Sequence, residues 1–154
     1  MEKRLRIVHV MATTGGVKGG LEKHTLELCA ALAQKHEVHL LADHSYADYC
    51  HNDVVFHALN FKQSRFNPLL YWQLFQLINH IQPHIIHAQA GKAASLLRWF
   101  KWLFRHIVFV ATVHGTTKNI KAYDSMDGVI AVSEQLAADF TSDNVRVIYN
   151  GTRP

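Results

Sequence analysis

A glycine-rich stretch near the N-terminus has the clearest potential for chemistry. It reads Gly15-Gly16-Val17-Lys18-Gly19-Gly20, and such a run loses more backbone entropy on folding than a plain connection requires. Residues at the spacing of one helix face follow it: Leu21, Thr25, Leu28, Cys29 and Leu32. We therefore predict a strand over 5–11, a loop at the glycines and a helix over 21–35. The N-terminus of that helix suits a phosphate, and a turn without a ligand is the alternative.

The spacing of the glycines excludes two common phosphate loops. A dinucleotide fingerprint needs glycines at i, i+2 and i+5, but Val17 takes the second place when Gly15 takes the first. A P-loop needs Gly-Lys-Ser/Thr, but Leu21 and Glu22 follow Gly20. Any phosphate bound here is therefore held in another way.

Further polar residues stand where predicted strands end. In open α/β sheets, ligands bind beyond the carboxyl ends of the strands, so we expect these residues to share one edge with the glycines. They are Asp43, Gln89, Lys92, His114, Ser133 and Asn150.

Three of these residues have competing interpretations. Asp43 follows the second strand, where a nicotinamide enzyme binds the ribose hydroxyl with an acid. Lys92 lies in the first turn of a predicted helix and opposes its dipole by about 0.3 to 1 kcal/mol, which a bound anion would reverse. A solvated lysine is the alternative. For His114, a purely structural role is the alternative.

Helix-period and strand-period segments alternate along the chain, which indicates an α/β fold. We predict a Rossmann-like, doubly wound parallel sheet of about seven strands with helices on both faces. Asn67 and Pro68 begin one helix as cap and first-turn residue. The other strands are expected over 37–42, 54–59, 84–88, 107–113, 127–132 and 145–149, and the other helices over 69–81, 92–105 and from Ser133. The segment 44–53 is expected to be a loop.

Composition restricts the class of protein. With 154 residues and 49% hydrophobic content, the chain suits one domain. It has no apolar run of about 18 residues, and we expect a cytoplasmic protein. The net charge of +4 favours anionic partners, but nothing indicates nucleic acid. Of the twelve histidines, His36 and His39, like His84 and His87, are three apart on predicted strands and face opposite ways, so no metal site is expected.

Four motifs in order resemble GT-B glycosyltransferases of the family 4 type. The first is the glycine stretch with Leu21-Glu22-Lys23-His24, and the second is Thr112-Val113-His114-Gly115-Thr116. The third is the run from Asp127 to Glu134, and the fourth is Tyr149-Asn150-Gly151. One departure is the fourth strand, where His84 and Gln89 replace the Asp and the second His of the family pattern.

The resemblance implies a retaining enzyme that transfers a sugar from a nucleotide-diphosphate sugar, with no other cofactor, in bacterial glycan, lipopolysaccharide or glycolipid synthesis. Residues 1–150 would be its N-terminal, acceptor-side domain and 151–154 the start of a linker to a donor-binding domain. His114 would be catalytic and contact the donor sugar. The donor phosphate or sugar would contact Gly15, Gly16, Gly19, Gly20 and Asn150, and the carbohydrate or lipid-linked acceptor would contact Lys18, Gln89, Lys92 and Ser133.

The predicted helix 92–105 also suggests a membrane contact. At helical spacing, basic residues and a tryptophan share one arc, while Leu96, Phe100, Leu103 and Phe104 face the other way. The arc consists of Arg98, Lys101, Trp102 and Arg105. It predicts peripheral binding to an anionic membrane surface on its cytoplasmic side, and a solvated face is the alternative.

Three other functions remain open. An NAD-dependent oxidoreductase would use the glycines and Asp43, a non-catalytic sugar-binding or regulatory module would need no second domain, and a nucleotide-sugar epimerase would share the GT-B fold.

Overall fold

The computed structural model of the chain describes residues 3–14, 19–64, 66–115, 120–140 and 144–149. Its centre is a seven-stranded sheet with the order β3-β2-β1-β4-β5-β6-β7. The strands are β1 (Arg6–Met11), β2 (Glu37–Ala42), β3 (Val55–Ala58), β4 (Ile85–Gln89), β5 (Val108–Val113), β6 (Gly128–Ala131) and β7 (Val145–Val147). The helices are α1 (Gly20–Leu32), α2 (Pro68–Ile81), α3 (Gly91–Leu97), α4 (Ile120–Asp124) and α5 (Glu134–Ala137), with a 3₁₀ helix η1 (His44–Tyr49).

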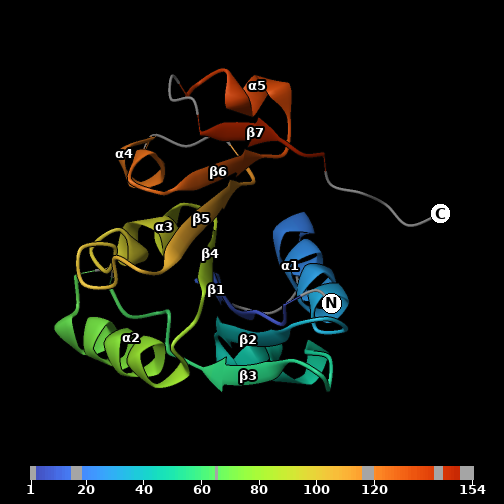
Figure 1. Cartoon of the computed structure of the whole chain (residues 1–154), viewed down its shortest axis with the longest axis vertical. Helices are drawn as coiled ribbons and strands as arrows, with labels where there is room; N and C mark the ends of the chain where they lie inside the picture. Colours follow the sequence, from blue (N-terminus) through green and yellow to red (C-terminus); the bar gives the residue numbers. More distant parts are fainter. Residues whose placement is uncertain (1–2, 15–18, 65, 116–119, 141–143, 150–154) are drawn as a thin grey trace.

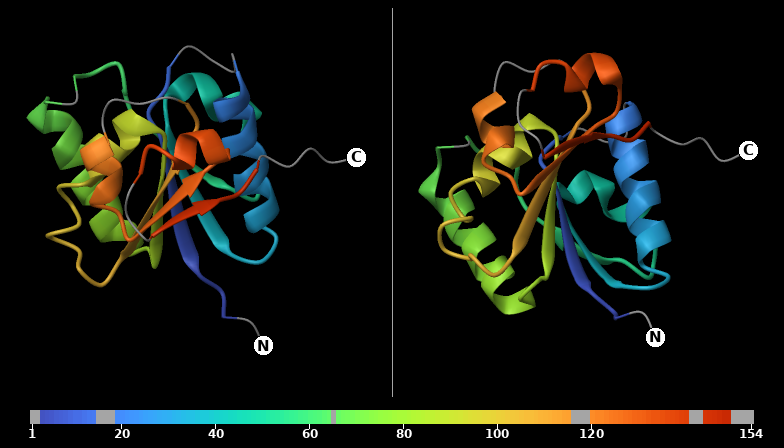
Figure 2. Two further views of the ribbon diagram at one scale, coloured as in Figure 1. Left: turned by 90° about the horizontal axis from the view of Figure 1, so that it is seen from above. Right: turned by 45° about the horizontal axis from the view of Figure 1, so that its top comes forward.

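Helices cover both faces of this sheet. The chain runs from β1 to β3 toward one edge and from β4 to β7 toward the other, and every strand pair is parallel. Because parallel connections cross over with a right hand, the two halves place their helices on opposite faces. α1 lies on one face, whereas α2, α3 and α4 lie on the other (Figure 1), and Figure 2 shows the same layers from two further sides. The predicted fold class is confirmed.

Two apolar clusters fill the space between the sheet and the helices. The larger one joins alternate strand residues such as Val10 and Ile86 to Leu74 of α2 and Leu96 of α3. The smaller one lies on the α1 side and joins Leu40 of β2 to Cys29 of α1 and Tyr46 of η1, among others. Toward the same side, β4 and β5 present polar residues, His87, Gln89 and Thr112, all buried. The α1 side of these two strands is therefore where the fold places polar chemistry.

The predicted start and stop signals of α2 are confirmed. The Asn67 carboxamide oxygen accepts a hydrogen bond from the Leu69 backbone N–H at 3.0 Å, and Pro68 is the first helical residue. The last helical residue is Ile81, and the C-cap residue Gln82 has a φ of 51° and directly precedes Pro83. Local sequence thus fixes both ends of the helix.

Two predicted elements differ from the structure. The helix expected over 92–105 ends at Leu97, and 98–103 form turns. Hydrogen bonds from Phe100 N–H to Leu97 O and from Leu103 N–H to Phe100 O, at 3.0 and 3.1 Å, tighten this segment, while Phe100 and Phe104 pack on α2. The contacts of Phe100 and Phe104 with α2 therefore outweigh the helical spacing of the apolar residues in this segment. Residues 44–49, expected to be a loop, form η1, because the Asp43 carboxylate caps it.

Candidate functional site

The candidate site lies at the carboxyl ends of β4 and β5, beside the point between β1 and β4 where the chain changes direction across the sheet. Gln89 is the last residue of β4 and pairs with Met11 of β1 and Thr112 of β5. His114 follows β5 directly, and its Nε2 lies 2.8 Å from Gln89 Oε1. The structure therefore brings together two of the predicted site residues, beside the switch point between β1 and β4, where open α/β sheets bind ligands.

A buried polar layer supports this pair. Gln89 Nε2 lies 3.4 Å from His9 Nδ1, and the His9 and His87 ring centroids are 4.9 Å apart. His87 Nε2 is 2.6 Å from the hydroxyl oxygen of Thr112. From the other side, the His24 ring of α1 meets the His114 ring edge-on at 5.5 Å. Four histidines and an amide thus connect the core to the sheet edge.

Burial keeps the imidazoles of His9, His87 and His114 neutral near pH 7. It lowers the pKa of His87 from 6.5 to about 4, with the neighbouring His114 and His24 adding to the effect. It also lowers the pKa of His114 from 6.5 to about 4, again with help from His24. The pKa of His9 is lowered well below its usual value, first by burial and then by His87 and His24. A neutral imidazole can donate one hydrogen bond and accept one.

The N-terminus of α1 faces no side-chain cap. Gly19 is the N-cap, and no side-chain hydrogen bond to it is found in the described part of the chain. A Cβ added at Gly19 would lie 3.7 Å from Glu22 Oε2, an ordinary contact, and at Gly20 it would meet nothing within 4 Å. Packing among the described residues therefore does not demand glycine at either position. Gly15, Gly16 and Lys18 lie outside the described residues, as does Asn150.

The other predicted site residues have local partners. The Lys92 ammonium donates to the backbone oxygens of Phe61 and Gln63, which join α3 to the loop after β3. The Ser133 hydroxyl accepts from the Leu136 N–H at 3.2 Å, so the predicted N-cap is confirmed. Their roles toward an acceptor stay predictions. Asp43 is buried and accepts from the N–H and hydroxyl of Ser45, at 3.2 and 2.7 Å, which engages the carboxylate that a nicotinamide enzyme would use.

Comparison with known proteins identifies the family of this chain. The sequence profile described as Glycosyltransferase Family 4 matches residues 18–154. The chain belongs to glycosyltransferase family 4. No curated protein matches it by sequence at a significant level.

Solved structures share the fold of this family 4 chain. Anabaena HepE in complex with UDP-glucose superposes with a TM-score of 0.73 and 18% identity, covering 97% of this chain and 44% of HepE. The lipopolysaccharide outer core galactosyltransferase WaaB gives 0.72 and 15%, covering 96% and 46%, and Acinetobacter baumannii MurG gives 0.70 and 13%, covering 97% and 46%. The fold is thus the Rossmann-like α/β fold seen in these GT-B glycosyltransferases, and the chain spans less than half the length of each.

Sequence reasoning missed part of the network in the family 4 chain. His87 and Gln89 are two apart on β4, so alternation already placed both on one face. His9 and His24 carried no comparable signal, because their relation to Gln89 and His114 depends on strand order and on how α1 packs. The turn after β4 was expected, but its left-handed backbone had no signal in the sequence. Ala90 there has a φ of 73°, a conformation that favours glycine.

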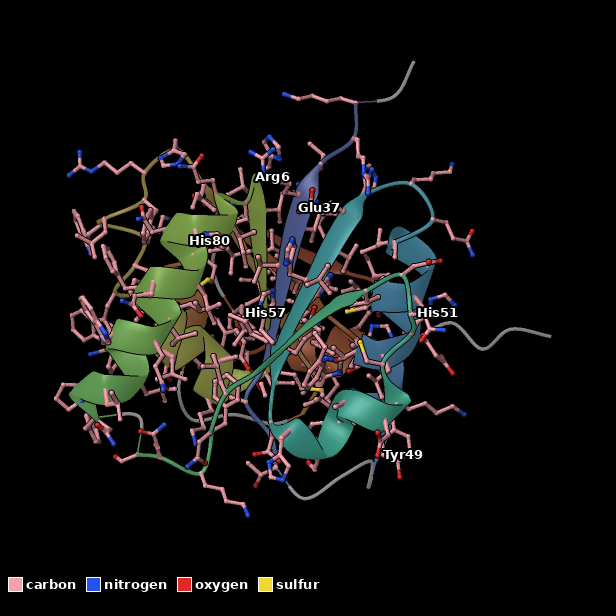
Figure 3. All side chains as sticks on the ribbon, turned by 90° about the horizontal axis from the view of Figure 1, so that it is seen from below. Arg6, Glu37, Tyr49, His51, His57 and His80 are labelled. Atoms are coloured by element: carbon pink, nitrogen blue, oxygen red, sulfur yellow. The ribbon has the colours of Figure 1, made fainter. Side chains whose placement is uncertain are left out.

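Other histidines lie toward the β3 edge and the amino ends of the strands. His39 Nδ1 is 2.9 Å from His57 Nε2, and His39 Nε2 is 2.7 Å from Glu37 Oε1; Glu37 and His57 are labelled in Figure 3. His36 and His84 accept hydrogen bonds from the backbone N–H groups of Leu5 and Arg6, respectively. Within the residues that the structure describes, no group of three His, Cys, Asp or Glu side chains is placed to hold a metal ion.

The segment 98–105 differs from the predicted basic arc. Lys101 Nζ lies 3.0 Å from Asp127 Oδ1 and donates to the Ser125 carbonyl oxygen at 2.6 Å, so it is bound to the protein. Leu103, expected to face the core, is 65% exposed because the helix ends before it. The Arg98 and Arg105 guanidinium groups lie over the Trp99 and Trp102 rings, at 5.0 and 5.9 Å.

An exposed aromatic surface extends from this segment onto α2. Tyr71 and Phe75 of α2 contact Phe100 and Phe104, with ring centroids 6.0 and 5.8 Å apart, so the two segments lie side by side. Their outward side chains define what we call the aromatic surface: Leu69, Trp72, Trp99, Trp102 and Leu103, all exposed. Among the described residues, no helix is long and apolar enough to cross a membrane.

Proposed function

We propose that this chain is the acceptor-side domain of a retaining glycosyltransferase that uses a nucleotide-diphosphate sugar and no other cofactor. The observation that carries the proposal is the hydrogen-bonded pair of the neutral His114 and Gln89, beside the switch point of the sheet. A sugar offers many hydroxyls, and uncharged donors and acceptors at the end of a sheet suit them. HepE, with the same fold, was crystallised with UDP-glucose, which supports a nucleotide sugar as donor.

Each part of the site has a proposed role. His114 contacts the donor sugar near the reacting carbon, and the uncapped end of α1 with its glycines (Gly15, Gly16, Gly19 and Gly20) approaches the diphosphate, together with Asn150. The positive end of α1 stabilises negative charge as the diphosphate leaves. The acceptor contacts Lys18, Lys92 and Ser133, of which Lys92 first has to leave its carbonyl partners. Gln89, which is 1% exposed, acts on the acceptor side through its contact with His114.

We further propose the domain organisation that this role requires. Residues 1–150 form the first domain and 151–154 begin a linker to a second domain that holds most of the nucleotide. The lengths of HepE, WaaB and MurG, each more than twice the part that this chain covers, support this division.

Replacement of His114 tests the catalytic assignment. Because an interaction strengthened in the transition state acts on kcat, His114→Ala in the complete enzyme should lower kcat by about 10² with a smaller change in KM. The matched control is His44→Ala, at an exposed position of η1. Steady-state kinetics with UDP-glucose and a panel of related donors measures both, and a kcat near the wild-type value for His114→Ala would refute the role.

We also propose that the acceptor is lipid-linked and that the domain binds the cytoplasmic face of a membrane, as in bacterial lipopolysaccharide or glycolipid synthesis. The support is the aromatic surface, where Arg98 and Arg105 flank exposed tryptophans. Tryptophan and arginine are typical of anionic lipid interfaces. The relation to WaaB, a lipopolysaccharide outer core galactosyltransferase, agrees with this setting.

Vesicle sedimentation tests the membrane proposal. We expect binding to phosphatidylglycerol vesicles at low salt that weakens with added salt and with Arg98→Glu plus Arg105→Glu. Lys101 is left in place, because Lys101→Glu would set a carboxylate beside Asp127 and disturb the fold. Binding that does not change in the double variant would contradict the proposal.

A further inference from the structure

The Gln89 carboxamide lies between two imidazoles and contacts one with each end. Its Oε1 lies 2.8 Å from His114 Nε2, and its Nε2 lies 3.4 Å from His9 Nδ1. Gln89 is 1% exposed and His9 is fully buried. The amide therefore has few other partners available.

This arrangement couples the protons of the two histidines. The two ends of a carboxamide have nearly the same size, so a half turn keeps both contacts but exchanges donor and acceptor. When the amide oxygen faces His114, His114 carries its proton on Nε2 and His9 must accept at Nδ1. When the amide nitrogen faces His114, His114 accepts at Nε2 and His9 donates from Nδ1. A neutral His9 carries one proton. Its Nε2 is therefore protonated when the amide oxygen faces His114 and unprotonated when the amide nitrogen faces His114.

The second nitrogen of His9 decides between the two states. His9 Nε2 is buried and has no hydrogen-bond partner in the described part of the chain. A buried N–H without an acceptor is rarer and more costly than a buried lone pair without a donor. Among the described residues, the groups that face the network are His87 and Thr112 across the strands and His24 from α1, and none of them makes a hydrogen bond to this atom. The state with the proton of His9 on Nδ1 is therefore favoured. In this state the Gln89 carboxamide is turned by half a turn from the orientation above, so that its nitrogen faces His114 and its oxygen faces His9.

We propose that Gln89 and His9 are positioning residues that hold His114 in the tautomer with its proton on Nδ1. Nε2 of His114 accepts from the Gln89 amide, so its other nitrogen carries an N–H group. His114 then acts as a hydrogen-bond donor.

This inference rests on the proposed function and specifies it. A histidine that donates from Nδ1 binds an oxygen of the nucleotide sugar, a hydroxyl or a phosphate oxygen. It has no free lone pair at Nδ1 or Nε2 with which to take a proton from the acceptor hydroxyl. His114 would thus orient the donor and would not act as a general base.

Nitrogen NMR on the imidazoles of the labelled 154-residue chain tests the proposal near neutral pH. We expect the Nδ1–H form of His114 to exceed the Nε2–H form at least about fivefold, the ratio for an orphan donor cost of about 1 kcal/mol. A wild-type His114 with a predominant Nε2–H form, or with a mixture of the two, would overturn the proposal. The measurement needs no sugar, so its failure is distinct from a failure to bind UDP-glucose in a separate titration.

Two variants check the coupling. In Gln89→Glu the carboxylate only accepts, so His114 must change to the Nε2–H form while His9 keeps its proton on Nδ1. In His9→Phe, which retains a ring of similar size, the bias on the amide disappears and both forms of His114 should be seen. His114 signals unchanged in both variants would overturn the proposal. If Gln89→Glu does not fold, Gln89→Met replaces it, with the same expected loss of the Nδ1–H form.

Discussion

At the scale of single residues, the network at the sheet edge shows how burial sets chemistry. The His114 and His87 rings lie within a cluster of histidines, and only a neutral imidazole fits such a place without a paired charge. The same burial that keeps His114 a hydrogen-bonding group makes the domain sensitive to acid.

The first prediction concerns that sensitivity. Burial lowers the pKa of His87 in the folded chain to about 4, from its ordinary value of 6.5. Between these two pH values the unfolded chain binds more protons than the folded chain, so the free energy of unfolding decreases as the pH is lowered. His87 alone should cost about 2 kcal/mol between pH 7 and pH 5. Urea unfolding at several pH values measures this.

Matched variants make the assignment specific. His87→Phe should be less stable at neutral pH, because Thr112 loses its partner, but its stability should decline less toward pH 5. His44→Gln changes an exposed side chain and should keep the wild-type slope. Equal slopes in wild type and His87→Phe would show that another group is responsible.

The second prediction concerns the strained turn after β4. Ala90 has a φ of 73°, where a side chain costs about 1 to 3 kcal/mol. Ala90→Gly relieves this strain. The greater conformational entropy of glycine in the unfolded chain offsets part of the gain, so the variant should be more stable by about 1 kcal/mol. Thermal unfolding measures the change. Ala93→Gly, inside α3, should instead destabilise, and a loss of stability in Ala90→Gly would argue against strain at the turn.

At the scale of elements, α2 combines two surfaces with different tasks. Its inner side packs Leu70, Leu74 and Ile78 into the larger core cluster. Its outer side exposes Leu69 and Trp72, which continue the aromatic surface. A helix packed on a sheet needs only one apolar side. The exposed apolar side chains on the outer side of α2 therefore indicate a surface that binds something outside this domain.

The third prediction separates these two sides with one type of substitution. Leu74→Ala opens a cavity at a residue with 0% exposure and should cost about 2 to 5 kcal/mol of stability. Leu69→Ala, at 54% exposure, should change stability by no more than about 0.5 kcal/mol but should weaken binding to anionic vesicles. Denaturant unfolding and vesicle sedimentation give the two readings. Full vesicle binding by Leu69→Ala would remove α2 from the membrane contact.

At the scale of the whole molecule, the described chain has one continuous sheet and its own core on both faces. Such a unit should fold by itself. The polar edge that we assign to the reaction lies at one end of that sheet, and a leaving diphosphate needs positive groups that the proposed second domain supplies.

The fourth prediction follows from this division. The 154-residue chain should unfold in a single urea transition, bind UDP-glucose only at about millimolar concentration, near −4 kcal/mol, and transfer no sugar. Circular dichroism, calorimetry and a product assay measure the three properties. Micromolar binding or any turnover would mean that the donor site lies within this chain.

The sequence alone determined the parallel α/β fold, the bounds of α2 and the placement of Gln89 and His114 at the same edge of the sheet. Alternating periods and strong caps act locally, and the carboxyl ends of parallel strands always share one edge. Only the tertiary structure decided that 98–103 leave the helix, that Lys101 pairs with Asp127, and that His9 and His24 join the site. These features depend on which side chains from distant segments fill the same space, and such packing energies exceed the small differences in local propensity that a sequence pattern reports.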